Sequence, residues 1–443
     1  MVKQMNDNTD GHQERAVLVG LVDTTKPVLE NEVEKSIEEL ALLAKTAGAE
    51  VVGSAIQRKK GIDNATFVGK GKLIEIKAAC EELRAELIIF DDELTGAQIR
   101  NIEAQTKMKV IDRTLLILDI FAQRAKSKEG KLQVELAQQK YRYSRLVGLG
   151  ESLSRLAGGI GTRGPGESKL ETDRRHIKRR IDLLKASLSE VGKRRGRLRE
   201  KRRDSDVVTI AVTGYTNAGK STLINRLCSS ELFVEDMLFA TLDSAARKLI
   251  LPDGLQVVLI DTVGFIRKLP HHLIDAFKST LEEVTDADII MHVVDASDDD
   301  LIRHMEIVED LLDQLNASAK QRITVFNKAD LIRPALNPED SLVLSDSSVI
   351  WKNRAYNIKD GNVVQVSSKT GEGFDQLLEI ISQLVQNAKT RIKILLPYKE
   401  TAILDFIRRN GSIDEIEYLA DGIQAVIQIA SSKLAYISEY VVK

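Results

Sequence analysis

The sequence predicts an α/β protein of several domains that are built mainly on parallel sheets. Three observations predict this fold class. Apolar strands alternate with amphipathic helices over two long stretches. Two long helical stretches, the second with a heptad pattern, lie between them. A glycine-rich loop joins a strand to a helix where the second α/β stretch begins. With 443 residues and about 150 residues per domain, the chain can form roughly three folding units.

Residues 1–125 are predicted to form an N-terminal α/β domain. Strands are expected over 16–22, 50–55, 87–91 and 110–112, and helices over 30–47, 73–84 and 96–105, the last of them capped by Thr95. Such an alternation predicts a parallel sheet with helices packed on it. The segment Val68-Gly69-Lys70-Gly71-Lys72 is either a phosphate-binding turn or a turn with solvated lysines, and the sequence favours the second interpretation.

Residues 126–203 are predicted to form an antiparallel helical hairpin. Helices are expected over 132–156 and 169–203, separated by a loop at 158–166 whose glycines exclude a helix. The second helix carries a heptad seam of Leu170, Ile177, Ile181, Leu184, Leu188, Val191 and Leu198. Residues 178–203 contain 12 Lys or Arg against 3 acidic residues, although the whole chain has a net charge of −2. This basic block indicates a polyanionic partner.

Residues 204–390 are predicted to form a doubly wound α/β domain that binds a phosphate. Strands are expected near 209–213, 248–251, 257–261, 289–295, 323–327 and 363–367. After the first of them, Gly214-Tyr215-Thr216-Asn217-Ala218-Gly219-Lys220-Ser221 satisfies the pattern G-x-x-x-x-G-K-[ST], and a helix follows from Thr222. In such a P-loop, backbone N–H groups surround the phosphates, the lysine neutralises the β and γ phosphates, and the serine binds Mg²⁺.

Two further segments select guanine over adenine. Asn327-Lys328-Ala329-Asp330 follows a predicted strand, and the carboxylate of Asp330 can accept two hydrogen bonds from the N1 and N2 edge of guanine, a donor pair that adenine lacks. Ser367-Ser368-Lys369 follows the next strand and matches a loop whose backbone packs against the guanine O6. The sequence therefore predicts GTP as the ligand.

Two segments between these motifs are predicted to contact magnesium and the γ-phosphate. In Asp261-Thr262-Val263-Gly264, the aspartate is expected at Mg²⁺ and the Gly264 N–H at the γ-phosphate. In Phe239-Ala240-Thr241-Leu242-Asp243, Thr241 is expected to close on Mg²⁺ when GTP is bound; the alternative is a solvated loop residue. Ser221, Thr241 and Asp261 are thus the predicted metal ligands.

Lys220, Thr241, Gly264 and Asn217 are the candidate catalytic residues. Residue 265 is Phe, whereas many GTPases place a water-orienting glutamine there. Intrinsic hydrolysis is therefore expected to be slow unless a partner completes the site. Asn217 is either the position at which some GTPases recruit K⁺ or a plain turn residue, and both interpretations stay open. His271 and His272 are expected to be surface residues.

Residues 391–443 are predicted to form a small α+β domain. Its pattern is a strand, a helix over 398–410, a strand, a hairpin signal at Asp421-Gly422, another strand and a final helix. No apolar run approaches the ~20 residues of a membrane helix, and the first 15 residues lack the apolar core of a signal peptide. The two cysteines match no metal or disulfide spacing. We expect a cytoplasmic protein.

The motifs VGKGK, GGIGTRGPGESKLETDRR, GYTNAGKS, FATLD, DTVGF, NKAD and SSKTGEG occur in this order, and with them nearly the whole chain resembles the HflX family of ribosome-associated GTPases. The resemblance implies binding to the 50S (large) ribosomal subunit and its rRNA, with roles in splitting or rescue of stalled ribosomes or in biogenesis. The basic residues within 174–203 fit salt-dependent phosphate contacts.

The sequence thus predicts a monomeric, Mg²⁺-dependent molecular switch that hydrolyses GTP to GDP and phosphate on the ribosome. Two alternatives stay open. The first is a potassium-activated GTPase of RNA modification, although no cysteine or cofactor motif for a second active site is evident. The second is an RNA-binding scaffold that holds GTP structurally.

Overall fold

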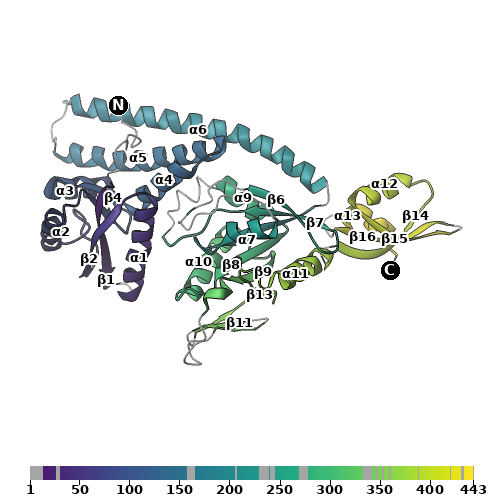
Figure 1. Ribbon diagram of the computed structural model, residues 1–443. Helices are drawn as coiled ribbons and strands as arrows, with labels where there is room; N and C mark the ends of the chain where they lie inside the picture. Colours follow the sequence, from purple (N-terminus) through teal and green to yellow (C-terminus); the bar gives the residue numbers. More distant parts are fainter. Residues whose placement is uncertain are drawn as a thin grey trace. The chain divides into compact units, whose positions relative to one another are not determined.

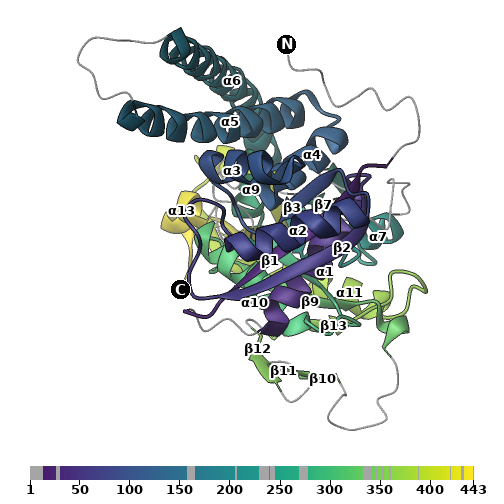
Figure 2. The ribbon, with the colours of Figure 1, turned by 90° about the vertical axis from the view of Figure 1, so that its left-hand side faces the viewer.

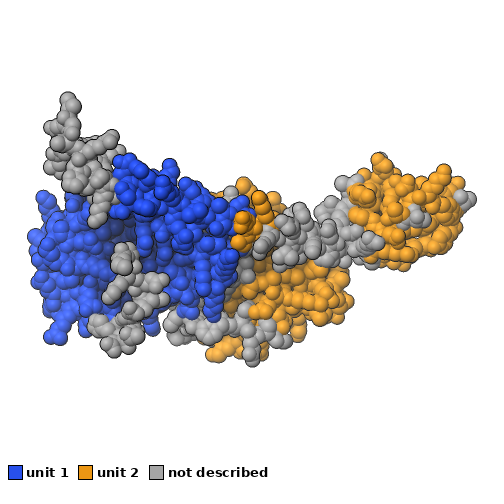
Figure 3. Space-filling view, turned by 90° about the horizontal axis from the view of Figure 1, so that it is seen from above, with its two compact units in different colours: residues 1–189, 235–243, 266–279 blue, residues 190–234, 244–265, 280–443 orange. Residues whose placement is uncertain are grey.

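The structure is a computed structural model, and it describes residues 13–25, 30–156, 165–204, 207–228, 239, 245–268, 278–332, 342–345, 348–351, 354–358, 361–387, 389–419, 421–430 and 434–442. The chain divides into two compact units: residues 1–189, 235–243 and 266–279 form the first, and residues 190–234, 244–265 and 280–443 form the second (Figure 3). The predicted α/β class with parallel sheets is confirmed. The division into four domains stays a prediction. Within the described ranges, every helix is too short or too polar to cross a membrane.

The N-terminal part of the first unit is a four-stranded parallel sheet with helices on both faces. Its elements are β1 (Arg15–Asp23), α1 (Glu30–Thr46), β2 (Glu50–Lys59), α2 (Lys70–Glu82), β3 (Leu87–Phe90), α3 (Gly96–Thr106), β4 (Lys109–Asp112) and α4 (Arg113–Arg124). The strand order is β2-β1-β3-β4, and all pairs are parallel. Helix α1 lies on one face, and α2 and α3 lie on the other (Figures 1 and 2).

The residues of β1 explain this layering. Val17 and Val19 are buried in one cluster with Leu73 of α2. Gly20 points to the other face, where a Cβ would lie 3.0 Å from Cδ1 of Ile37 in α1. Because successive strand residues point to opposite faces, a strand with helices on both sides must be apolar along its whole length. This requirement accounts for the nearly continuous apolar run of β1.

Two long helices, α5 (Lys128–Leu156) and α6 (Pro165–Asp204), form the predicted hairpin. Leu132, Leu136 and Tyr143 pack with Ile177, Ile181, Leu184 and Leu188, four residues of the predicted seam. Arg180 donates to both carboxylate oxygens of Glu135 at 2.7 and 2.8 Å, and Arg174 lies 6.0 Å over the ring of Tyr143. Later residues of α5 thus meet earlier residues of α6, so the helices are antiparallel.

The glycine-rich loop between these helices is shorter than predicted. Residues 158–166 were predicted to lie outside any helix, but α6 already begins at Pro165. Proline suits the first turn of a helix, because the N–H that it lacks would have no partner within the helix there. The remainder of the predicted loop lies outside the described residues.

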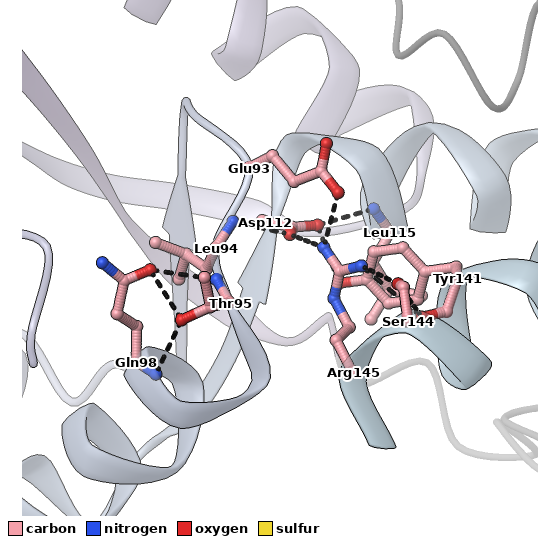
Figure 4. A network of polar contacts seen from close by, with 9 residues as sticks. All are labelled: Glu93, Leu94, Thr95, Gln98, Asp112, Leu115, Tyr141, Ser144 and Arg145. Carbon is pink, nitrogen blue, oxygen red and sulfur yellow. Dashed lines mark hydrogen bonds and ion pairs between the residues drawn. The ribbon is translucent and has the colours of Figure 1, made fainter. Parts of the chain in front are cut away.

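Asp112 connects the sheet to α4, a helix that the sequence analysis did not predict, and to α5. Its carboxylate accepts hydrogen bonds from Leu115 N at 2.9 Å and from Leu94 N at 3.1 Å. From α5 it accepts hydrogen bonds from the hydroxyl of Tyr141 at 2.9 Å and the guanidinium of Arg145 at 2.7 Å (Figure 4). Four donors on one buried carboxylate hold the hairpin on the N-terminal sheet.

The second unit contains a six-stranded sheet of the doubly wound type. Its elements are β5 (Val208–Gly214), α7 (Lys220–Leu227), β6 (Ala245–Ile250), β7 (Gln256–Asp261), α9 (Lys278–Asp286), β8 (Ile289–Asp295), α10 (Leu301–Gln314), β9 (Gln321–Asn327), η1 (Ala329–Leu331), β13 (Val363–Gln365) and α11 (Phe374–Asn387). The strand order is β13-β9-β8-β5-β7-β6, and β6 alone is antiparallel to its neighbour in this sheet. All six predicted strands are present.

A small antiparallel sheet of β10 (Val343–Leu344), β11 (Ser348–Trp351) and β12 (Arg354–Asn357) follows η1 and was not predicted. Its strands of two to four residues are too short to show a period in the sequence. Val349 and Trp351 are buried in one cluster with Phe326 of β9. This insertion therefore packs against the main sheet.

The C-terminal part has the predicted order of elements. These are β14 (Lys389–Leu396), α12 (Thr401–Asn410), β15 (Gly411–Leu419), β16 (Gly422–Ala430), α13 (Leu434–Ile437) and η4 (Ser438–Tyr440). The strands form an antiparallel sheet in the order β14-β16-β15, and the β15–β16 hairpin turns at the predicted Asp421-Gly422. The final helix is only four residues long.

Replacing Tyr141 with Phe is expected to lower the free energy of unfolding by about 1–3 kcal/mol, because the buried carboxylate of Asp112 loses a donor. Burial and the charge of Asp112 raise the pKa of Tyr141, so the phenol remains a donor throughout the usual pH range. Urea unfolding followed by circular dichroism measures the loss. The control is Tyr143→Phe, which removes a hydroxyl from the same helix; equal losses in both variants would contradict the role of this bond.

Candidate nucleotide-binding site

The P-loop joins β5 to α7, and two glycines allow its close approach to neighbouring strands. A Cβ on Gly214 would lie 2.2 Å from the carbonyl oxygen of Val293, and one on Gly219 would lie 2.2 Å from Nδ2 of Asn327. Gly219 also has φ +87°, in the left-handed region. Side chains would therefore strain the backbone at both positions. Asn217 has φ 61° and is exposed, as a turn residue is.

The side chain of Lys220 binds the backbone of the P-loop. Its ammonium donates to the carbonyl oxygens of Gly214 at 3.1 Å and Tyr215 at 2.7 Å, and the residue is buried. Burial lowers the pKa of Lys220 to about 8, against the opposing effect of the charge of Asp261. A buried ammonium near its titration point would be stabilised by an anion beside it. The arrangement suits a phosphate.

Ser221 and Asp261 form an oxygen-rich pair beside this lysine. The Ser221 hydroxyl donates to Oδ2 of Asp261 at 2.8 Å, and Asp261 is fully buried at the end of β7. Hydroxyl and carboxylate oxygens are ligands that Mg²⁺ accepts, and Mg²⁺ usually takes few protein ligands together with phosphates and water. The described residues contain no group of three or more His, Cys, Asp or Glu able to hold a metal. The donor set fits a magnesium ion bound together with phosphates.

Gly264 and Phe265 lie against the P-loop. Thr216 N donates to the carbonyl of Phe265 at 2.8 Å, and Phe265 N donates to the carbonyl of Gly214 at 3.1 Å. A Cβ on Gly264 would lie 3.0 Å from Cα of Thr216 and 3.1 Å from Nζ of Lys220. A side chain at residue 264 would therefore force Thr216 of the P-loop to shift. The ring of Phe265 is buried and offers no polar atom that could orient a water molecule.

Asn327 joins the P-loop to the two loops of the predicted guanine site. Its Nδ2 donates to the carbonyl of Ala218 at 2.9 Å, and its Oδ1 accepts from the backbone N and the hydroxyl of Ser368 at 3.0 and 2.8 Å. The hydroxyl of Ser367 donates to Oδ1 of Asp330 at 2.6 Å. A carboxylate has about four acceptor positions, so Asp330 keeps capacity to accept further hydrogen bonds.

The structure thus brings together, at the carboxyl ends of β5, β7, β9 and β13, the predicted residues Gly214–Thr222, Asp261–Gly264, Asn327–Asp330 and Ser367–Lys369. Ligands bind at this edge in open α/β sheets. Ala240, Thr241, Leu242 and Asp243 lie outside the described residues, as do His271 and His272. Phe239 is described; it is buried and packs on Phe121 in the first unit.

Several contacts near the site were not predicted. The ring of His304 in α10 stacks on Tyr215 at 3.8 Å with an interplanar angle of 10°, and its Nδ1 lies 3.4 Å from the Asp298 carboxylate. Lys328, at φ 64°, pairs with Asp295 at 2.7 Å. Tyr215 and Lys328 lie in predicted motifs, but their partners His304 and Asp295 belong to none, so no sequence signal indicates these pairs. The predicted VGKGK segment starts α2, and its Lys72 pairs with Glu75 at 2.9 Å.

Comparison with known proteins identifies the family. Family models match residues 34–122 (GTP-binding GTPase N-terminal), 124–202 (GTP-binding GTPase Middle Region), 209–328 (50S ribosome-binding GTPase) and 352–436 (HflX C-terminal domain). The GTPase HflX of Caldanaerobacter subterraneus subsp. tengcongensis is 47% identical over 419 residues, 94% of this chain and 91% of that one. The chain belongs to the HflX GTPase family.

Other relatives of this HflX-family chain are similarly complete. The GTPase HflX of Lacrimispora saccharolytica is 47% identical over 427 residues, 96% of each chain, and that of Escherichia coli is 39% identical over 390 residues, 87% of this chain and 86% of its own. A solved GTP-binding protein from Sulfolobus solfataricus in complex with GDP covers 85% of this chain and 99% of its own at 24% identity, with a TM-score of 0.43. The resemblance predicted from the motifs is confirmed.

Binding of GDP to the free protein at pH 8 is expected to take up about half a proton, because Lys220 is then about half protonated and a bound phosphate raises its pKa. For the same reason the affinity for GDP is expected to be highest below pH 8 and to fall as the pH rises above 8, where Lys220 of the free protein loses its proton. Calorimetry in two buffers of different ionisation enthalpy measures the uptake at pH 8, where the terminal phosphate is already ionised. Binding without proton uptake at this pH would contradict the assignment.

Proposed function

We propose that this protein is a GTP hydrolase that acts as a nucleotide-dependent switch on the large ribosomal subunit. One observation carries the nucleotide part of the proposal. The buried Lys220, already bonded to the P-loop carbonyls, and the Asp330–Ser367 pair lie at one edge of a parallel sheet, and Asn327 connects the loops that carry them. Charge for phosphates and acceptors for guanine thus lie at one edge of the same sheet.

Each residue of the site then has a definite role. The P-loop amides and Lys220 hold the β and γ phosphates, and Ser221 and Asp261 hold Mg²⁺ together with Thr241. Bound Mg²⁺ supplies charge neutralisation between the phosphates. The N–H of Gly264 contacts the γ-phosphate. Asp330 accepts from guanine N1 and N2, while the backbone of Ser367–Lys369 packs at O6.

Hydrolysis by the free protein is proposed to be slow. Phe265 is buried and apolar, so it cannot orient the attacking water as a glutamine would. A partner that orders Thr241 and the water would accelerate the reaction through positioning and electrostatic stabilisation. The exposed, left-handed Asn217 is compatible with a turn residue; a potassium ion at this residue stays a hypothesis.

Two observations support the ribosome as partner. Residues 209–328 match the family model described as 50S ribosome-binding GTPase. In α6, Lys178, Arg179, Lys185 and Lys193 are exposed, and such side chains can neutralise RNA phosphates. Arg180 differs from them, because Glu135 binds it in a bidentate ion pair. Helix α6 is therefore proposed as a contact to rRNA.

Purified large subunits are expected to raise GTP turnover at least tenfold and to bind the protein more tightly with a GTP analogue than with GDP. Lys220→Ala should abolish turnover because the phosphates lose their buried charge. Phosphate release and co-sedimentation measure the two effects, and a salt series should weaken co-sedimentation steeply. Equal binding with GTP, GDP and no nucleotide would favour the scaffold alternative. Turnover that depends on K⁺ and is unchanged by subunits would favour the RNA-modification type.

A further inference from the structure

A lysine four residues after Gly264 belongs to a cluster of charges at the N-terminal sheet. Lys268 Nζ lies 2.5 Å from Oδ2 of Asp91 and 2.7 Å from Oδ1 of Asp92. All three residues belong to the first compact unit, although Gly264 belongs to the second. The segment that follows the predicted γ-phosphate contact is therefore bound by an ion pair that joins it to the carboxyl end of β3.

The carboxylate of Asp91, which binds this lysine, is held in place by other residues of the first unit. Its buried carboxylate accepts from Arg113 Nη1 at 2.7 Å and from the hydroxyl of Ser36 at 2.7 Å, and Arg113 also pairs with Glu39 at 2.7 Å. Burial raises the pKa of Asp91, but the charges of Arg113 and Lys268 outweigh it and hold the pKa below its usual value. Asp91 is thus kept ionised in the interior, and a second cation satisfies it.

The other end of the segment is fixed on the P-loop. Phe265 exchanges backbone hydrogen bonds with Gly214 and Thr216, which draws Gly264 against Lys220. Three residues, 265–267, separate Gly264 from Lys268. The four residue steps from Gly264 to Lys268 span about 14 Å at most, and Phe265 and Ile266 are both buried. Only two residues, Ile266 and Arg267, thus separate the hydrogen-bonded Phe265 from Lys268 along the chain.

The backbone at Lys268 indicates that the ion pair holds this conformation. Lys268 has φ 52°, in the left-handed region, which costs a residue with a Cβ roughly 1–2 kcal/mol. Strained conformations persist where their surroundings fix them, and they cluster at switch segments. The two carboxylates are such a constraint.

A residue of the FATLD motif also contacts the first unit. Phe239 of the FATLD motif is buried, and its ring lies 4.6 Å from that of Phe121 in α4, edge to face at 76°. Phe239 also has a left-handed backbone, at φ 57°. One residue of the FATLD motif, Phe239, and one residue shortly after Gly264, Lys268, thus both contact residues of the first unit.

We propose that Lys268 is a positioning residue for recognition of the γ-phosphate. Held by Asp91 and Asp92, it keeps Gly264 drawn against the P-loop, where its N–H can meet a γ-phosphate. The N-terminal domain thereby contributes to the preference for GTP over GDP, and by linkage the bound nucleotide changes the stability of the ion pair. This inference rests on the proposed GTPase function.

Lys268→Met in the full-length protein tests the proposal, because it keeps the length of the side chain and removes the charge. The affinity for a non-hydrolysable GTP analogue should fall at least fivefold, while the affinity for GDP, which lacks the phosphate that Gly264 meets, changes less than twofold. Asp92→Asn should shift the ratio of the two affinities in the same direction but less. Lys268→Arg keeps the positive charge and should keep most of the preference for the GTP analogue over GDP. Calorimetry measures both affinities.

Lys77→Met is the matched control, because Lys77 is equally exposed, at 41% of its side-chain area, and pairs with Glu81 on α2. Circular dichroism checks that each variant is folded. If Lys268→Met does not fold, Asp92→Asn still tests the proposal. An unchanged ratio of GTP-analogue to GDP affinity, or an equal loss of both, would overturn the inference alone. Failure of the unmodified protein to bind guanine nucleotides would instead overturn the proposed function.

Discussion

The side-chain amide of Asn327 is the constraint on which the candidate site depends. It binds the P-loop, 109 residues earlier in the chain, and the Ser367–Lys369 loop, 41 residues later at Ser368. Because Asn327 ends β9, an interior strand of the sheet, these bonds hold the phosphate-binding loop and the predicted guanine loop at fixed positions on one sheet. A ligand spanning both loops meets groups whose spacing is already fixed, so it pays little ordering entropy on binding.

Electrostatics give this edge of the sheet a second constraint. Lys220 and Asp261 are both buried, and buried charges are tolerated when they are paired, hydrogen-bonded or neutralised by a ligand. Lys220 is held by two carbonyl oxygens and Asp261 by Ser221. A magnesium nucleotide would bring an anion to the lysine and a cation to the aspartate, so each buried charge would gain the partner of opposite sign. The site is therefore electrostatically complementary to that ligand.

Much of the fold and of the local structure of the motifs could be predicted from the sequence, because these features depend on short-range patterns. The apolar run of β1, the Thr95 cap of α3, the seam at Ile181 and Leu184, and the P-loop between strand and helix are examples. Helix α4 escaped prediction because it follows Asp112 without any loop, and the strands β10–β12 escaped because they are too short to show a period. Which side chains meet across the fold could not be predicted. Asp91 and Lys268 are 177 positions apart, and nothing in the sequence around either residue indicates that they form an ion pair.

The central claim is that this pocket is built for a guanine nucleotide, and calorimetric titration with GDP, ADP and xanthosine diphosphate in the presence of Mg²⁺ tests it most directly. The unmodified protein should bind GDP at least a hundredfold more tightly than ADP, since ADP lacks the two donors for the Asp330 carboxylate and hydrogen bonds to charged groups contribute about 1.5–3 kcal/mol each. Asp330→Asn should exchange this preference for xanthine, whose C2 carbonyl can accept from the new amide. Equal affinity for GDP and ADP, or no change of preference in Asp330→Asn, would contradict the account.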